Sequence, residues 1–241
     1  MDAKLLSLRG VSHAFGTLPV LEDLWLEVAP GEFLAVVGPS GCGKTTLLNL
    51  LAGFATPQAG ELRRLGTTRM VYQQDGLFPW LTAAENIALA FGPGAALTEH
   101  AWQLDELLTL TQLQDFAGHY PYQLSGGMRR RVELARVLAG PADVLLLDEP
   151  FAALDYLTRR RMHRELVRML AARPRAVVLV THDIDEAVLL ADRVVVLSPR
   201  PARVRCEFRL DLPRQRTITH PQVLQTVQRI LAELALDQAE S

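Results

Sequence analysis

A glycine-rich segment between an apolar run and a helical pattern gives this sequence its clearest chemical capacity. Residues 38–45 read Gly-Pro-Ser-Gly-Cys-Gly-Lys-Thr and fit the phosphate-loop pattern G-x-x-x-x-G-K-[ST]. In that pattern the backbone N–H groups surround phosphate oxygens, the lysine reaches the terminal phosphates and the hydroxyl binds Mg²⁺. A glycine-rich turn without a ligand is the alternative, which the joint presence of lysine, threonine and both flanks disfavours. The predicted phosphate contacts are Gly38, Pro39, Ser40, Gly41, Cys42, Gly43, Lys44, Thr45 and Thr46.

Two adjacent carboxylates close a later apolar run. Asp148 and Glu149 follow residues 144–147, and the carboxyl ends of buried strands are where α/β proteins place their sites. We expect Asp148 to hold Mg²⁺ through water and Glu149 to polarise the water that attacks the terminal phosphate. The alternative is a solvated strand end, and the phosphate loop upstream favours the catalytic interpretation.

These residues need a parallel sheet to position them. Apolar runs at 32–37, 144–147, 176–180 and 193–197 alternate with helical patterns. Continuous apolar strands of this kind indicate an α/β fold, with a parallel sheet covered on both faces. The phosphate loop separates the first of these runs from a predicted helix at 44–52.

Between residues 75 and 140 the pattern is helical only. Pro79 and a Gly-Pro-Gly cluster at 92–94 interrupt it. This pattern predicts a helical subdomain inserted into the α/β core of a single domain. The predicted boundaries are about 1–74 and 141–212 for the α/β core, about 75–140 for the helical subdomain and about 221–237 for a C-terminal helix.

The composition is that of a globular protein without a nucleic-acid footprint. Of 241 residues, 49% are apolar and 22% charged, and the formal net charge is −2, so the overall charge does not suggest a nucleic-acid-binding protein. Lys4 and Lys44 are the only lysines, so Lys44 is not a generic surface charge. Cys42 and Cys206 give no disulfide framework, and no apolar run approaches the roughly 20 residues of a membrane span. Residues 1–4 lack a signal-peptide pattern, so we expect a soluble, cytosolic protein.

A second candidate anion site stands upstream of the carboxylates. Leu124, Ser125, Gly126, Gly127 and Met128 precede a helical pattern, and a helix start presents free backbone N–H groups to an anion. One chain then carries two phosphate sites but only one phosphate loop. This imbalance suggests that two copies of the chain cooperate.

Two polar residues follow further strands in a fixed order. Gln73 comes after a short strand at 70–72, and His182 after the strand at 176–180. This order of motifs resembles the ATP-binding subunits of ABC transporters, from about residue 5 to about residue 210. The resemblance implies the P-loop NTPase class of α/β fold. Specifically, it implies an ABC-ATPase core with an antiparallel β subdomain and an inserted α-helical subdomain.

The resemblance gives each motif a family name. Residues 38–46 match Walker A, 144–149 Walker B, 124–128 the signature and 153–155 the D-loop. His182 matches the switch histidine.

The adenine and Q-loop positions also have family counterparts. Phe15 stands where the family stacks an aromatic ring on adenine, with Val20 nearby, and a core role for Phe15 is the alternative. Gln73 matches the Q-loop glutamine, with Gln74 as the alternative. The implied Mg²⁺ ligands are Thr45, Gln73 and Asp148.

A homodimer that holds ATP and Mg²⁺ between its subunits is what the resemblance implies. Each ATP would lie between Walker A of one subunit and the signature of the other, with Asp155 along the interface. Removal of the γ-phosphate would then release the two halves. The implied catalytic residues are Lys44, Glu149 and His182, with His182 contacting the γ-phosphate and Glu149. The implied contacts to the other subunit's ATP come from Leu124, Ser125, Gly126, Gly127, Met128 and Asp155.

Three departures from the family pattern concern partner recognition. Met128 stands where glutamine is usual, at a position that mainly offers backbone, so activity should survive. Arg129, Arg130 and Arg131 replace a more usual mixed Gln/Arg run and are expected to add positive charge near the partner's phosphates. The short stretch 60–70 predicts that a hairpin found in most relatives is trimmed.

Segments 74–80, 181–187 and 198–204 are similar to those of nitrate, sulfonate and taurine importers. This similarity implies the ATP-hydrolysing subunit of a bacterial importer for a small anion, peripheral on the cytoplasmic face of the inner membrane. Its implied partners are a second copy, integral membrane permease subunits and, through them, a solute-binding protein, with no nucleic acid. Phe78 and Trp80 would meet the permease, and core packing is the alternative for each.

Three other functions are alternatives to this one. The first is import of another small solute. The second is a soluble ABC ATPase in DNA repair or on the ribosome, which usually has a long coiled coil or tandem ATPase domains. The third is a P-loop kinase, which would lack the signature and the switch histidine. The sequence contains both of these motifs and neither a coiled coil nor a tandem repeat.

Overall fold

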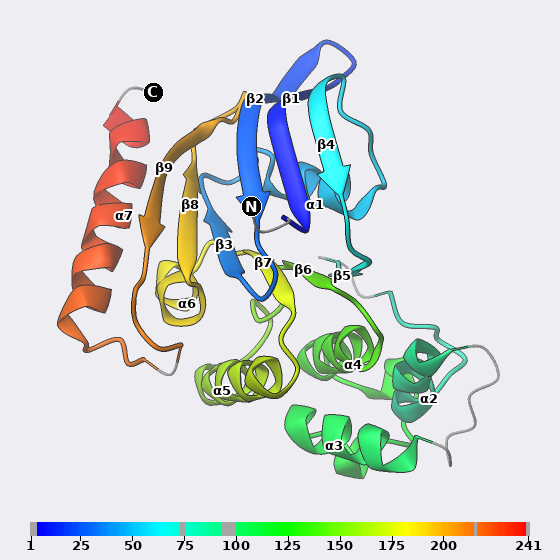
Figure 1. Cartoon of the computed structure of the whole chain (residues 1–241). Helices are drawn as coiled ribbons and strands as arrows, with labels where there is room; N and C mark the ends of the chain where they lie inside the picture. The colour runs from blue at the N-terminus through cyan, green and yellow to red at the C-terminus, as the bar shows by residue number, and fades with distance from the viewer. Residues whose placement is uncertain (1–3, 73–75, 93–99, 215, 240–241) are drawn as a thin grey trace.

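Six strands form the central sheet: β3 (Phe33–Val37), β5 (Thr68–Val71), β6 (Val144–Asp148), β7 (Ala176–Val180), β8 (Arg193–Leu197) and β9 (Val204–Arg209). The computed structural model describes residues 4–72, 76–92, 100–214 and 216–239 (Figure 1). The strand order is β5-β6-β7-β3-β8-β9, parallel from β5 to β8, with β9 antiparallel at one edge. The parallel sheet predicted from the apolar runs is therefore confirmed.

The two faces of this sheet support two separate hydrophobic clusters. On β3, Phe33, Ala35 and Val37 belong to one cluster, while Leu34 and Val36 belong to the other. None of the five is more than 1% exposed, as expected for a strand buried on both faces. Helices α4 (Gly126–Ala139), α5 (Tyr156–Ala172) and α6 (Ile184–Leu190) contribute to the cluster on the first face. The second face is covered by α1 (Lys44–Ala52) and by a second sheet.

The second sheet is antiparallel and has three strands. They are β1 (Leu6–Phe15), β2 (Leu18–Val28) and β4 (Ala59–Arg64), in the order β2-β1-β4. It is the antiparallel β subdomain expected from the family resemblance. The short stretch 60–70 contains the end of β4 and the start of β5, so it passes directly from one sheet to the other.

In the described part of the segment between β5 and β6, the regular elements are all helices or 3₁₀ turns joined by loops. This segment contains α2 (Ala83–Ala88), α3 (Ala101–Thr111) and α4, with 3₁₀ turns η1 (Leu89–Phe91), η2 (Gln114–Phe116) and η3 (Pro121–Gln123). Thr82 and Glu85 start α2 with a capping box. The insertion of helices into the α/β core is confirmed, and the proposed domain boundaries stay a prediction.

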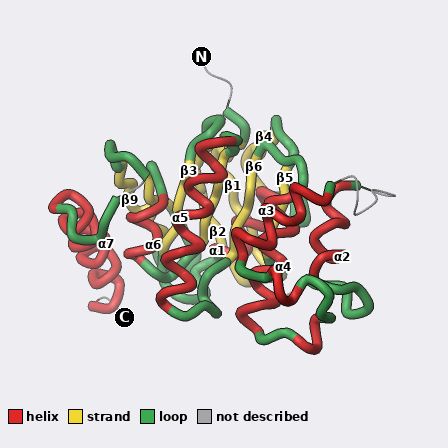
Figure 2. Tube along the Cα trace, turned by 90° about the horizontal axis from the view of Figure 1, so that it is seen from below, coloured by secondary structure: helices red, strands yellow, loops and turns green. Residues whose placement is uncertain are grey.

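The C-terminal helix α7 (Pro221–Ala239) packs at the other end of the molecule from α2 (Figures 1 and 2). Val223 and Ile230 are fully buried and join the cluster on the first face of the sheet, against α6 and β8. Leu224 and Leu231, the next residue in each case, are about half exposed, which is the pattern of an amphipathic helix. Over the described residues, no helix combines the length and apolar character needed to cross a bilayer.

Candidate nucleotide site

The phosphate loop links the end of β3 to the start of α1. Gly41 and Gly43 have φ angles of 74° and 124°, which residues with a Cβ rarely adopt. A Cβ on Gly43 would lie 2.8 Å from Cγ1 of Val20, so the loop needs glycine on steric grounds as well. Val20 itself is 4% exposed. The structure therefore places Val20 underneath the loop, where it supports the backbone.

Lys44 lies inside this loop. Its Nζ donates to the carbonyl oxygens of Gly38 and Pro39, at 2.8 and 2.9 Å, and the residue is 8% exposed. The first turn of α1 has neither a side-chain cap nor an acidic residue. Such a helix start combines free N–H groups with the positive end of the helix dipole. The loop is therefore electrostatically suited to an anion.

Thr45 and Asp148 meet where α1 and β6 come together. The Thr45 hydroxyl donates to Asp148 Oδ2 at 2.9 Å. Burial raises the pKa of the Asp148 carboxyl, the hydrogen bond from Thr45 lowers it and the charge of Glu149 raises it again. A buried carboxylate beside a hydroxyl oxygen is a suitable donor pair for Mg²⁺. Within the described residues, no group of three or more His, Cys, Asp or Glu side chains is arranged to hold a metal ion.

Glu149 and His182 form the next pair along the same edge. His182 Nδ1 lies 3.1 Å from Glu149 Oε1, and the two side chains are 63% and 23% exposed. Glu149 has a φ of 47°, an unfavourable angle for a residue with a Cβ. Its backbone N–H donates to the carbonyl of Val180 at 2.9 Å. The structure thus shows the contact between His182 and Glu149 that the family resemblance implies.

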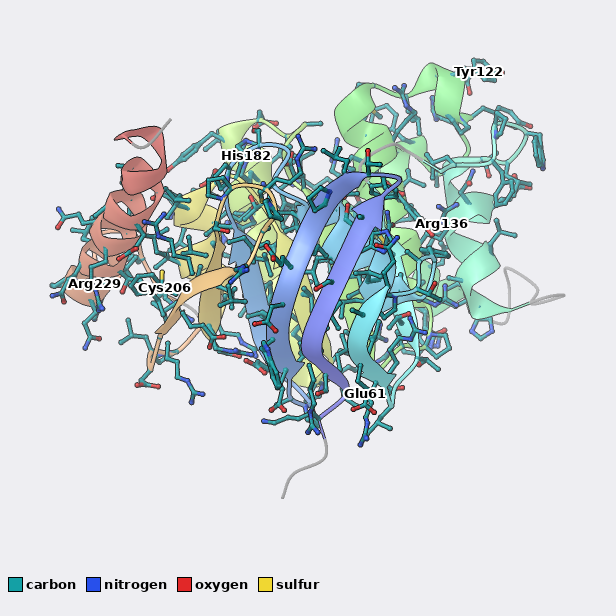
Figure 3. The ribbon with its side chains drawn as sticks, turned by 90° about the horizontal axis from the view of Figure 1, so that it is seen from above. Glu61, Tyr122, Arg136, His182, Cys206 and Arg229 are labelled. Atoms are coloured by element: carbon teal, nitrogen blue, oxygen red, sulfur yellow. The ribbon has the colours of Figure 1, made fainter. Side chains whose placement is uncertain are left out.

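The signature lies at the start of α4, on the face of the sheet opposite α1. Ser125 caps this helix, with its Oγ accepting from the Met128 N–H at 3.2 Å, and Leu124 is buried. Gly127 touches the D-loop, because a Cβ there would lie 3.1 Å from the Ala153 carbonyl. In Figure 3 Tyr122, just before the signature, and His182 both lie toward the upper side of the view.

The D-loop leads into α5 through Asp155. The Asp155 carboxylate caps α5 by accepting from the Thr158 N–H at 3.0 Å, and these hydrogen bonds lower its pKa. Because α1 and α4 pack on opposite faces, the phosphate loop and the signature of one chain belong to different layers. That arrangement supports two half-sites, although the roles of the signature and of Asp155 stay predictions.

The structure decides between stacking on adenine and core packing for Phe15. Phe15 is 59% exposed, so the core interpretation is wrong, and its ring meets His13 edge-on at 5.1 Å between centroids. An exposed ring at a strand end is available for stacking on a base. Gln73 and Gln74 lie outside the described residues.

The expectation for Arg129, Arg130 and Arg131 is wrong for Arg130. Arg130 is 6% exposed and points into the protein. Arg129 donates to the Leu124 carbonyl at 2.9 Å, and Arg131 donates to the Thr111 carbonyl at 2.7 Å. Successive residues on a helix point about 100° apart, so three consecutive arginines cannot share one face. All three thus bind carbonyls of their own chain.

Sequence reasoning missed a clamp between α5 and α6. Arg159 donates to Asp183 Oδ2 at 2.8 Å and to the carbonyl of Leu154 in the D-loop at 3.2 Å. Four residues further along α5, His163 Nε2 lies 2.8 Å from Glu186 Oε1 of α6. The clamp ties the D-loop to the residue after His182. In the sequence, Arg159 and His163 are four residues apart on α5, and Asp183 and Glu186 are three residues apart at the start of α6, so each pair lies on one face of its helix. The sequence does not show that these two faces meet.

Two aromatic side chains are exposed beyond the 73–75 segment. Phe78 and Trp80 are 42% and 68% exposed, and their ring centroids lie 5.3 Å apart. The core alternative is therefore wrong for Trp80 and at best partial for Phe78. Buried Asn86 fixes the turn that carries them, because its amide accepts from the Phe78 N–H and donates to the carbonyls of Phe78 and Leu81.

Known proteins are similar to this chain in sequence and in fold. The ABC transporter family model matches residues 21–152. A taurine import ATP-binding protein of Jannaschia sp. is 41% identical over 221 residues, covering 85% of this chain and 82% of that protein. An aliphatic sulfonates import ATP-binding protein of Agrobacterium fabrum is 43% identical over 234 residues, covering 95% and 83%. A dimeric ATP-binding cassette solved with ADP and Pi, in a post-hydrolysis state, superposes with a TM-score of 0.76 at 31% identity, covering 86% of this chain and 99% of that one.

Replacing Asp148 by asparagine should stabilise the nucleotide-free protein. The Asp148 pKa is higher in the folded state than in the unfolded state, so above the unfolded pKa of about 3.9 ionisation weakens the fold. The contribution of this carboxyl to stability is therefore present at low pH and lost as the pH rises. Asp148→Asn keeps an acceptor for Thr45 and removes the buried charge. By calorimetry we expect a rise in Tm of at least about 2 °C at pH 7.5, shrinking toward pH 5.

Asp155→Asn is the matched control, because hydrogen bonds lower the pKa of Asp155 in the folded state. Its ionised form supports the fold at neutral pH, so this variant should show no gain in Tm. A lower Tm for Asp148→Asn at pH 7.5 would contradict the account of the site.

Proposed function

The chain belongs to the ATP-binding subunits of ABC transporters, and from this premise we propose that it energises a bacterial importer by binding and hydrolysing ATP. The observation that carries the proposal is the pair of contacts Thr45–Asp148 and Glu149–His182, adjacent at the carboxyl ends of β6 and β7. One pair suits the metal and phosphate of a nucleotide, and the other suits a water beside the γ-phosphate.

Within one subunit, the phosphate loop binds and orients the ATP. Backbone N–H groups of the loop and Lys44 hold the β- and γ-phosphates, and Phe15 stacks on the adenine. Thr45, Asp148 and Gln73 would hold Mg²⁺, which would neutralise charge that develops on the phosphates. Glu149 accepts a hydrogen bond from the attacking water, and His182 orients the Glu149 carboxylate and contacts the γ-phosphate.

A second copy completes each site. The start of α4, with Ser125 and Gly127, offers its N–H groups to the γ-phosphate bound by the other subunit. Asp155 lies along the interface between them. The γ-phosphate then joins the two subunits, and hydrolysis removes that link, which converts chemistry into movement. The dimeric cassette with ADP and Pi supports this arrangement as a relative of the same fold.

The names of the relatives support an importer of a small organic anion. Taurine and aliphatic sulfonates, named for two of them, share a sulfonate group. We propose a solute of this class, with nitrate or another small solute as the alternative. The solute itself would bind the permease and a solute-binding protein. We propose that the ATPase binds the same permease from the cytoplasmic face of the inner membrane.

We propose that Phe78 and Trp80 dock on the permease. Exposed aromatic pairs on a fixed turn are typical of protein interfaces, and buried Asn86 makes this turn rigid. The turn directly follows the 73–75 segment that holds the predicted Q-loop glutamine. A movement of the permease against this turn would therefore be transmitted to the predicted Q-loop glutamine through only a few residues of chain.

Ser125→Arg should separate ATP binding from ATP hydrolysis. The arginine would block the partner's γ-phosphate without touching the phosphate loop of its own chain. We expect monomeric ATP affinity within about twofold of wild type and a fall in hydrolysis of at least about a hundredfold, the scale of losing a transition-state anion contact. Lys44→Ala is the contrasting variant, which should lose ATP binding itself. If Ser125→Arg removes ATP binding from the monomer, the cross-subunit assignment is wrong.

Trp80→Ala should detach the protein from its membrane partners. A tagged chain, expressed in its native cells, is expected to co-purify from the membrane fraction with integral membrane subunits. Loss of a central aromatic anchor of an interface weakens binding by at least about tenfold. Trp25→Ala is the matched control, because Trp25 is 58% exposed but lies on the antiparallel sheet. Equal loss for both variants would contradict the docking surface, and recovery with ribosomes or DNA-repair proteins would contradict the importer.

A further inference from the structure

A buried ion pair on α4 lies directly beneath the carboxyl end of β6. Arg130 and Glu133 are 6% and 0% exposed, and Arg130 Nη1 lies 2.8 Å from Glu133 Oε2. Burial of two charges requires full hydrogen bonding, since removal from water is otherwise expensive. The contacts of Arg130 and Glu133 indicate what this buried pair does.

The guanidinium of Arg130 binds two successive backbone carbonyls, one on each side of the Glu149 Cα. Its Nη2 donates to the carbonyl oxygens of Asp148 and, at 3.1 Å, of Glu149. Its Nη1 donates to the carbonyl of Tyr72, the last described residue before the 73–75 segment, as well as to Glu133. One side chain of the signature helix thus contacts the ends of β5 and β6.

Glu149 needs such support because of its backbone. Its φ of 47° is unfavourable for any residue with a Cβ and persists only where the surroundings hold it. On one side the Glu149 N–H donates to Val180 on β7, and on the other side Arg130 binds its carbonyl. The direction of the Glu149 carboxylate toward His182 depends on this backbone conformation.

Glu133 orients the guanidinium and extends the contact. Besides binding Arg130, Glu133 accepts weakly from the Tyr72 N–H at 3.4 Å. One turn further along α4, Arg136 donates to the carbonyl of Gly76 at 2.9 Å. The signature helix therefore holds both described neighbours of the 73–75 segment. Burial raises the pKa of Glu133 and the charge of Arg130 lowers it, which fits a carboxylate that depends on this partner.

We propose that Arg130, held by Glu133, is a positioning residue that fixes the backbone of Glu149 for hydrolysis and couples it to the signature helix. The inference rests on the proposed catalytic role of Glu149. Glutamine at this position would have a shorter side chain with one NH₂ group and could not bind the four acceptors that Arg130 binds. Loss of Arg130 should therefore lower kcat while leaving the binding of ATP intact.

A double-mutant cycle tests this role. The variants are Arg130→Gln, Glu149→Gln and the combination, in the full-length protein, with single-turnover ATP hydrolysis as the readout. We expect Arg130→Gln to lower kcat by about tenfold with KM for ATP within about twofold. In the Glu149→Gln background the same change should cost less than about twofold, since its effect passes through the missing carboxylate. Arg168→Gln, on an exposed arginine of α5, is the control and should change neither parameter.

Stability is separated from positioning by a further variant. Arg130→Gln leaves the Glu133 carboxylate buried without its cation, which by itself lowers the stability of the fold. The double variant Arg130→Gln with Glu133→Gln removes both charges and avoids this cost. This variant should regain thermal stability and still show the tenfold lower kcat. Recovery of kcat along with thermal stability in this variant would overturn the proposal. The proposal would also be overturned if Arg130→Gln lowered kcat by the same factor in the wild-type background and in the Glu149→Gln background.

Amide hydrogen exchange of the peptide around Glu149 gives a readout that does not require hydrolysis. We expect faster exchange of the Glu149 N–H in the doubly neutral variant than in wild type, and unchanged exchange would overturn the proposal. If wild type binds ATP without hydrolysing it, the proposed function fails. The exchange measurement then still decides whether Arg130 holds the Glu149 backbone.

Discussion

The hydrogen bond from Thr45 to Asp148 joins the start of α1 to the end of β6, and the rest of the site is placed relative to it. It sets the phosphate loop beside the carboxylates, although the two segments are separated by 103 residues. Glu149 follows directly, and pairing of β6 with β7 brings it to His182. The same bond places a partly desolvated carboxylate beside an anion-binding loop. A metal–nucleotide complex would relieve this unfavourable arrangement.

The sequence predicts well those features that short-range chemistry determines. The apolar runs specify buried strands, and the phosphate loop needs its glycines for both conformation and space, as Gly43 against Val20 shows. The end of α1 at Gly53 likewise follows from local capping, since Gly53 is left-handed with φ 86°. Phe15 is different, because only its exposure in the fold excludes a core role.

Features that depend on the packing of distant elements were not predictable. β9 pairs antiparallel with β8, and no local pattern in residues 204–209 indicates which edge they join. The direction of Arg130 depends on the rotation of α4 against the sheet, which turned an expected surface charge into a buried contact. The clamp of Arg159 on Asp183 required α5 and α6 to lie side by side. In each case the sequence supplies the residue and the tertiary structure supplies its partner.

We propose that one chain contains two half-sites, and that ATP joins two chains through them. Size-exclusion chromatography with light scattering on Glu149→Gln, with and without ATP, tests this most directly. The account predicts a monomer without nucleotide and a dimer with ATP, since slow hydrolysis preserves the γ-phosphate link. The same variant carrying Ser125→Arg should remain a monomer while binding ATP. A Glu149→Gln protein that binds ATP stoichiometrically and stays monomeric would contradict the account.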